Sequence, residues 1–142
     1  MLTITPEAWR TMVAHAREAY PRECCGVLLG TLAGEDERTA TVAVACRNAY
    51  EGERRDRFVI DPSDQLAAQK RARAEDLEVL GFFHSHPDEE AYFSATDLAH
   101  SWPWYSNVVL SVRGGALAGA ACFRADEART RAEPEGLAYP VE

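Results

Sequence analysis

Two histidines and an aspartate at short spacing are the residues of this chain best suited to chemistry. His84 and His86 stand at the end of the apolar run 77–83, which predicts a buried strand. Side chains two residues apart on a strand point to the same face, so the two imidazoles converge. Asp97 lies eleven residues beyond His86 and can fold back to meet them. Two histidines, one carboxylate and an open fourth position are the ligands expected of a catalytic zinc.

A purely structural interpretation competes with this one. The histidines could be polar residues at the mouth of a loop, and residues 94–97 could be only the capping box of a helix. The combination of Pro87, Ser94 and Asp97 with the histidines at this spacing favours the metal site. We therefore expect a metal centre, with Ser94 also opening a helix.

The same residues carry a resemblance to a known family. The motif consists of residues 84–87 (His-Ser-His-Pro), a six-residue loop and residues 94–97 (Ser-Ala-Thr-Asp). It resembles the JAMM signature of the MPN-plus (Mov34/PAD-1) zinc metallopeptidases, and most of all their small single-domain prokaryotic members. The resemblance implies the MPN fold, an α/β (α+β) arrangement of a mixed β-sheet flanked by helices and similar to cytidine deaminases.

The resemblance also implies roles for individual residues. His84, His86 and Asp97 would bind one Zn²⁺ per chain. Glu23, in the segment Pro-Arg-Glu-Cys-Cys-Gly of residues 21–26, matches the family's general base. Taken by itself Glu23 would be an ordinary solvated charge between a helix and a strand. Ser94 would donate a hydrogen bond to the developing oxyanion.

The implied reaction is hydrolysis of an amide bond after the C-terminal tail of a ubiquitin-like protein of the sulfur-carrier type. Whether the amide nitrogen belongs to a lysine or to the main chain stays open, and so does the metal, because two histidines and a carboxylate also bind iron. The alternative is a catalytically silent MPN-type interaction scaffold. A zinc deaminase is excluded, since the chain lacks the His-x-Glu and Pro-Cys-x-x-Cys motifs.

The composition limits the possible binding partners and the possible cellular compartment. The chain has 142 residues, 46% hydrophobic and 27% charged, which predicts one soluble domain over residues 1–142. A net charge of −8 argues against nucleic acid and against anionic membranes. The N-terminus lacks the features of a signal peptide, and no apolar run is long enough for a transmembrane helix, so we expect a cytoplasmic protein.

The four cysteines agree with a reducing compartment. They include no Cys-x-x-Cys pair, and all four lie in or beside apolar stretches, so we expect buried thiols and no cysteine zinc site. A nucleophilic role for Cys24 or Cys25 beside a histidine is the weaker interpretation.

Helices and strands are expected to alternate along the chain. The first helix runs from Thr5 to about Tyr20, with His15 solvated on its outer side. Further helices are expected from Asp61 to about Glu75 and from Ser94 to near Trp102. A turn is expected at residues 34–37 and a polar loop at residues 48–55. The expected strands cover residues 25–32, 39–46, 58–60, 77–83, 107–112 and 117–124, and the tail from residue 128 adds an edge strand or is partly loose.

For several residues near the motif, the sequence leaves more than one role possible. Tyr92 and Phe93 either pack their loop onto the body or line a groove for an extended tail, and packing is the favoured interpretation. His100 is expected to be a surface or outer-sphere histidine. The aromatic cluster Trp102, Trp104 and Tyr105 is typical of a core or of a dimer contact, and the oligomeric state stays open between monomer and homodimer.

Overall fold

The computed structural model describes residues 1–34, 36–52 and 57–140, in which eight strands form one mixed sheet. The order across the sheet is β7-β6-β5-β4-β2-β3-β1-β8. The strands are β1 (Leu2–Ile4), β2 (Cys25–Leu32), β3 (Arg38–Cys46), β4 (Glu78–Pro87), β5 (Ser106–Arg113), β6 (Ala116–Ala125), β7 (Ala132–Glu135) and β8 (Leu137–Ala138).

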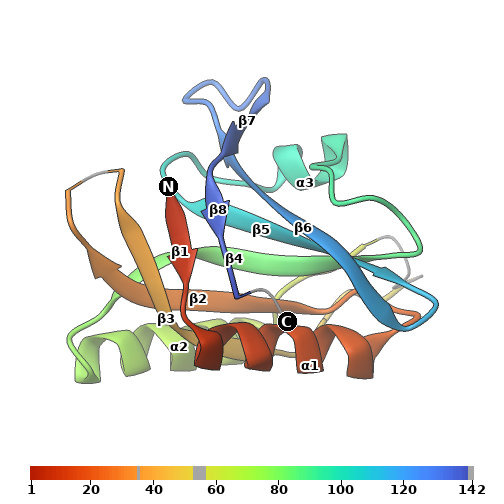
Figure 1. The fold of residues 1–142 in the computed structure, drawn as a ribbon, viewed down its shortest axis with the longest axis horizontal. Helices are drawn as coiled ribbons and strands as arrows, with labels where there is room; N and C mark the ends of the chain where they lie inside the picture. Colours follow the sequence, from red (N-terminus) through yellow and green to blue (C-terminus); the bar gives the residue numbers. More distant parts are fainter. Residues whose placement is uncertain (35, 53–56, 141–142) are drawn as a thin grey trace.

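Three helices accompany the sheet: α1 (Pro6–Ala19), α2 (Pro62–Ala74) and the short α3 (Ala95–Ala99). In Figure 1, α1 and α2 lie along the lower border of the sheet and α3 lies at the upper side. Thr5 and Asp61 cap α1 and α2, and a proline follows each cap at the first helical turn, where its missing N–H is not needed. None of the helices in these described ranges is long and apolar enough to cross a membrane.

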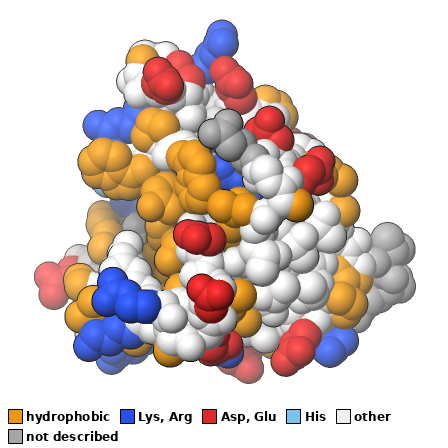
Figure 2. All heavy atoms as spheres, turned by 90° about the vertical axis from the view of Figure 1, so that its left-hand side faces the viewer, with side chains coloured by type: hydrophobic (Ala, Val, Ile, Leu, Met, Phe, Trp, Pro, Cys, Tyr) orange, Lys and Arg blue, Asp and Glu red, His pale blue; other side chains and the backbone are white. Residues whose placement is uncertain are grey.

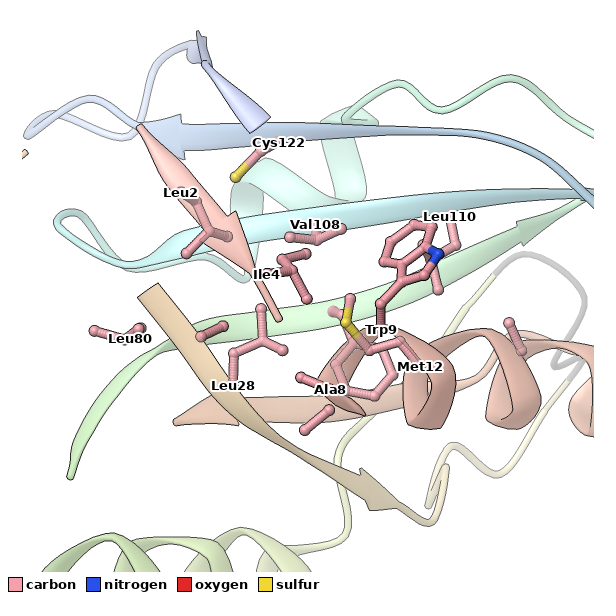
Figure 3. Packing of buried hydrophobic residues seen from close by; sticks show 14 of the residues in the cluster. Leu2, Ile4, Ala8, Trp9, Met12, Leu28, Leu80, Val108, Leu110 and Cys122 are labelled. Carbon is pink, nitrogen blue, oxygen red and sulfur yellow. The ribbon is translucent and has the colours of Figure 1, made fainter. Parts of the chain in front are cut away.

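The alternation of side chains along β2 divides the apolar core in two. Leu28 packs in the larger cluster under α1, whereas Val27 and Leu29 pack in the cluster that includes Ala68 and Ala72 of α2. Within the larger cluster, Figure 3 shows Trp9 and Met12 of α1 directed toward the sheet, near Leu110 of β5. The sheet is therefore covered by a helix on each side, and this fixes the position of its central strand β4.

Strand β4 carries the predicted histidines and lies between β2 and β5. It pairs antiparallel with β2 and parallel with β5. Gly81 permits a close approach of β5, because a Cβ at this position would lie 1.8 Å from the main-chain oxygen of Ser106. The strand continues through His84 and His86 to Pro87, so it is longer than the predicted run 77–83.

Several predicted boundaries are wrong in ways that matter for the site. Residues 58–60 form no strand, and only an isolated bridge joins Ile60 to Asn48. The third helix ends at Ala99 instead of near Trp102, and Pro103 disfavours helical backbone at the residue before it. The predicted turn at residues 34–37 and the loop at 48–55 include positions outside the described residues.

Figure 2 shows hydrophobic side chains gathered on the side of the molecule that lies at the left in Figure 1. Trp104 covers the buried Arg38 guanidinium at 4.0 Å and packs edge-on against Tyr105. Trp102 and Trp104 are 63% and 41% exposed, so a core position, one of the two expected roles, does not fit these residues, and the expected dimer contact stays a prediction.

Candidate metal centre and active site

His84, His86 and Asp97 converge on one point, as the sequence predicts. The distance between the two histidine Nε2 atoms is 3.3 Å. The Asp97 Oδ2 atom lies 3.1 Å from Nε2 of His84 and 3.2 Å from Nε2 of His86. In the described part of the chain, no other histidine, cysteine, aspartate or glutamate side chains form a cluster of this kind. These three residues are called the triad below.

The triad has the dimensions of a tetrahedral metal site. Zinc binds nitrogen and oxygen ligands at about 2.0–2.2 Å, so two ligands on a tetrahedron are separated by roughly 3.3–3.5 Å. The three observed separations of 3.1–3.3 Å lie close to this value. Three protein ligands leave the fourth vertex open, which is the arrangement of a catalytic site and not of a structural one.

The hydrogen bonds around His86 favour a cation in the centre of the triad. Its Nδ1 lies 3.1 Å from the main-chain oxygen of Glu90, which can only accept a hydrogen bond. In the neutral ring the proton is therefore on Nδ1, and Nε2 presents a lone pair to Asp97 Oδ2. Lone pairs that face one another at this distance repel unless a proton or a metal ion lies between them.

The ionisation of the triad also suits a metal. Burial by itself raises the pKa of Asp97, but its contacts with the imidazoles of His84 and His86 hold that pKa well below its ordinary range. Burial lowers the pKa of His84. A carboxylate and neutral imidazoles are the forms in which these side chains bind metals.

Aromatic rings enclose the triad. Phe58 stacks on His84 with ring centroids 4.6 Å apart, and Tyr92 packs edge-on against His86 at 4.9 Å. Phe93 stacks on Phe123 of β6 at 5.6 Å, which confirms that this residue packs its loop onto the body. The two histidines are consequently only 2% and 4% exposed. A site with these walls holds little water, which strengthens electrostatic interactions inside it.

The segment that leads into β2 brings the backbone of Glu23 beside the end of β4. In the register of β2 and β4, Cys25 lies opposite His84, and the Ser85 amide donates to the Cys24 carbonyl oxygen at 3.2 Å. Continuing the antiparallel register by one residue brings Glu23 opposite His86. Glu23 is only 4% exposed, so the description of it as a solvated charge is wrong. Only pairing between distant segments buries Glu23 beside the end of β4, and the local sequence carries no sign of this burial.

Charge effects on Tyr92 agree with this position of Glu23. Partial burial raises the pKa of the Tyr92 hydroxyl, and the negative charges of Glu89, Asp97 and Glu23 raise it further. The carboxylates of Asp97 and Glu23 thus both act on the loop that covers His86.

Ser94 and Asp97 form the predicted capping box. The Ser94 hydroxyl oxygen accepts from the Asp97 amide, and the Ser94 amide donates to Asp97 Oδ2, both at 3.0 Å. The cap therefore aims the carboxylate at the histidines. Because the hydroxyl serves as acceptor in the cap, its own hydrogen stays available for a further hydrogen bond.

A pocket of about 290 Å³ opens beside His84 and Asp97. One of its walls consists of residues 57–60, and the opposite wall includes His100 and Trp102. The His100 ring is exposed and bonds the Thr96 carbonyl oxygen at 2.9 Å, so it is a surface histidine as expected. The remaining lining residues are Gln65, Phe82, Phe93, Thr96, Ser101 and Asn107.

Two residues near the site were not recognised in the sequence. His15 was expected to be solvated, but its Nε2 lies 3.1 Å from the Cys25 carbonyl oxygen and 3.0 Å from that of Cys46. It therefore joins the ends of β2 and β3 just beyond Glu23. The feature of the sequence that could have indicated this contact is the position of His15 three residues after Met12, which is buried. Asn48, expected in a polar loop, bonds to the carbonyl oxygens of Glu23 and Arg57, which belong to two distant segments.

The cysteines are buried free thiols in the structure, as predicted. Burial raises the pKa of Cys24 to about 12 and that of Cys46 to about 11. Thiols with such pKa values are almost fully protonated near neutral pH, and the thiolate is the nucleophilic form. A nucleophilic cysteine is therefore not supported.

Comparison with known protein sequences identifies a matching family model and similar individual proteins. The family model for prokaryotic homologs of the JAB domain matches residues 5–129. A desampylase of Haloferax volcanii is 33% identical over 118 residues, which cover 80% of this chain and 82% of that protein. A CysO-cysteine peptidase of Mycobacterium tuberculosis is 35% identical over 99 residues, which cover 69% of this chain and 64% of that protein.

Solved structures show the same architecture. A Desulfitobacterium hafniense protein superimposes with a TM-score of 0.84 at 30% identity, covering 100% of this chain and 94% of the other. A JAB1/MPN domain protein from Archaeoglobus fulgidus gives a TM-score of 0.58 at 15% identity, covering 99% and 98% of the two chains. The mixed sheet flanked by helices that the sequence predicts is confirmed by this likeness.

Proposed function

The chain belongs to the family of prokaryotic homologues of the JAB domain, and on that premise we propose that residues 1–142 act as a single-domain zinc metallopeptidase. The substrate is the C-terminal tail of a ubiquitin-like protein of the sulfur-carrier type, joined through an amide bond to a lysine or to a main-chain nitrogen. The names of the relatives, desampylase and CysO-cysteine peptidase, support this class of substrate. The observation that carries the proposal is the triad, with its tetrahedral dimensions and a pocket beside it.

The metal would be held by His84, His86 and Asp97. Bound there, zinc supplies Lewis-acid chemistry, which acidifies water and polarises the carbonyl group of an amide. We expect the rings of Phe58 and Tyr92, which pack on the two histidines, to favour a thin, extended segment of substrate. The pocket beside His84 would receive the tail that precedes the cleaved bond.

Glu23 serves as the general base and then as the general acid. Its carboxylate takes one proton from the attacking water as the water oxygen bonds to the amide carbon. The same proton passes to the nitrogen as the carbon–nitrogen bond breaks, which gives an amine and a carboxylic acid that keeps the second proton of the water. Transfer of that second proton to the amine gives the carboxylate and the ammonium group. A carboxylate that is largely buried beside a metal is suited to such proton transfer.

Ser94 donates its hydroxyl hydrogen to the oxygen that becomes negative during the attack. We expect Ser94→Ala to lower kcat about 10²-fold, the usual loss when one oxyanion donor is removed. The zinc content should stay at the parental value, because no ligand is changed. Steady-state kinetics and elemental analysis on the same protein samples measure both quantities.

Ser94→Thr is the matched control for this variant, because threonine keeps both the helix cap and a hydroxyl donor. It should retain most of the parental kcat. If Ser94→Ala instead loses zinc and activity together, the serine serves only to orient Asp97 through the capping box, and the role in oxyanion stabilisation is wrong.

The proposed function is tested with two probes that differ only in the amide nitrogen. A ubiquitin-like sulfur carrier ending in Gly-Gly is joined to a lysine side chain in one probe and to a main-chain nitrogen in the other. We expect the zinc-loaded protein to cleave at least one probe after the terminal glycine. A chelator should abolish cleavage, and added zinc should restore it. Zinc binding without cleavage of either probe would support the scaffold alternative.

A further inference from the structure

Asn48 follows β3 directly, and its side chain makes four hydrogen bonds to main-chain atoms. Its Nδ2 donates to the carbonyl oxygens of Glu23 at 3.2 Å and Arg57 at 3.1 Å. Its Oδ1 accepts from the amides of Tyr50 at 3.1 Å and Val59 at 3.0 Å. A primary amide has two donor hydrogens and two acceptor lone pairs, so these contacts use its full capacity. They also fix which amide atom is nitrogen.

Two of these bonds fix the residue that covers a triad histidine. The Arg57 carbonyl precedes Phe58 and the Val59 amide follows it, so Asn48 holds the backbone on both sides of the Phe58 ring. A further bond, from the Ala49 amide to the Val59 carbonyl at 2.7 Å, anchors the same segment. Phe58 stacks on His84, and residues 57–60 form one wall of the pocket.

The other donor bond reaches the strand of the general base. Glu23 enters β2 from the α1 side, whereas the 57–60 segment returns toward α2, and these two segments are far apart in the sequence. Asn48 bonds to both through one nitrogen atom. The amide therefore determines the spacing between the main chain of Glu23 and the wall that faces the substrate.

We propose that Asn48 is a positioning residue for the hydrolysis proposed above, on which this inference rests. It holds the main chain of Glu23 and the 57–60 wall at a fixed separation, without itself being a ligand of the metal. Asparagine suits this position because aspartate would direct a carboxylate oxygen at two carbonyl oxygens, and glutamine is longer by one methylene. Displacement of reacting groups by about 1 Å can lower a rate on the order of 10²-fold.

The test compares Asn48→Ala and Asn48→Asp with the parent, all loaded with zinc. In both variants we expect kcat/KM on the cleaved probe to fall about 10- to 10²-fold while zinc content stays at one per chain. Amide hydrogen exchange, followed by mass spectrometry, should rise in peptides containing residues 22–25 and 57–60 and stay unchanged in β5 and β6. Asn48→Asp keeps the acceptor oxygen, so the Tyr50 amide should be better protected in it than in Asn48→Ala.

A control separates positioning from a general loss of stability. Thr5→Ala removes a side-chain bond to main chain at the cap of α1, away from the triad, and should lower Tm with little change in kcat. The proposal is overturned by parental kcat/KM and parental exchange at residues 57–60 in Asn48→Ala. It is also overturned if the lost activity returns on cooling and exchange rises throughout the chain. Failure of the parent to cleave either probe would count against the proposed function instead.

Discussion

Replacement of Asp97 by alanine is expected to remove the metal and the activity together. Asp97 Oδ2 forms one vertex of the triad and lies within 3.2 Å of both histidine nitrogens. Without it only two ligands remain, and the negative charge that offsets the cation is lost. We expect zinc to fall from near one per chain to near zero, and hydrolysis to fall by roughly 10³-fold or more.

Elemental analysis of protein purified without a histidine tag measures this change, and it also distinguishes zinc from iron. The control is Asp36→Ala, because the Asp36 side chain is 87% exposed and the change in charge is the same. Circular dichroism should show that both variants are folded. One tightly bound zinc in Asp97→Ala would mean that the triad is not the metal site, and the proposed ligand set would be wrong.

Replacement of Glu23 by glutamine is expected to separate metal binding from catalysis. Glutamine has nearly the shape of glutamate but cannot accept the proton of the attacking water. We expect zinc content to stay near one per chain while kcat falls about 10²- to 10⁴-fold, the range for loss of a general base. KM should change little, because the pocket wall at residues 57–60 is untouched.

The matched control for this variant is Glu18→Gln, the same change at an exposed position on α1. It should have the parental kcat and zinc content. Equal rates in Glu23→Gln and the parent would refute the assignment of the base. Loss of zinc in Glu23→Gln would instead make Glu23 part of the metal site, which the present assignment does not expect.

The triad was predictable because its information is local. His84 and His86 are two residues apart on a strand, and Asp97 follows within a short loop that a capping box terminates. Strand periodicity and helix capping depend on residues that are close in the sequence, so both can be predicted from the sequence. The buried strands and both long helices were predicted for the same reason, with errors limited mostly to their ends.

The residues that sequence reasoning missed are those whose partners lie far away. His15 bonds to the ends of two strands, and Asn48 bonds to segments before and after it that pairing brings together. Residues 58–60 have the composition of a strand, but the backbone there is held by the Asn48 side chain and forms only an isolated bridge. When a polar side chain, and not a neighbouring strand, supplies the hydrogen bonds to the backbone, the sequence shows no periodic pattern that would indicate it.

The sequence by itself therefore determined the candidate ligand set, the family resemblance and the mixed α/β class, because each depends on spacings within about fifteen residues or on a motif. The tertiary structure alone decided that Glu23 is buried just before β2 and that Phe58 stacks on His84. Those contacts depend on the register between β2 and β4 and on hydrogen bonds across the molecule. Such register is set by burial on both faces of the sheet, a property of the whole fold that no single segment encodes.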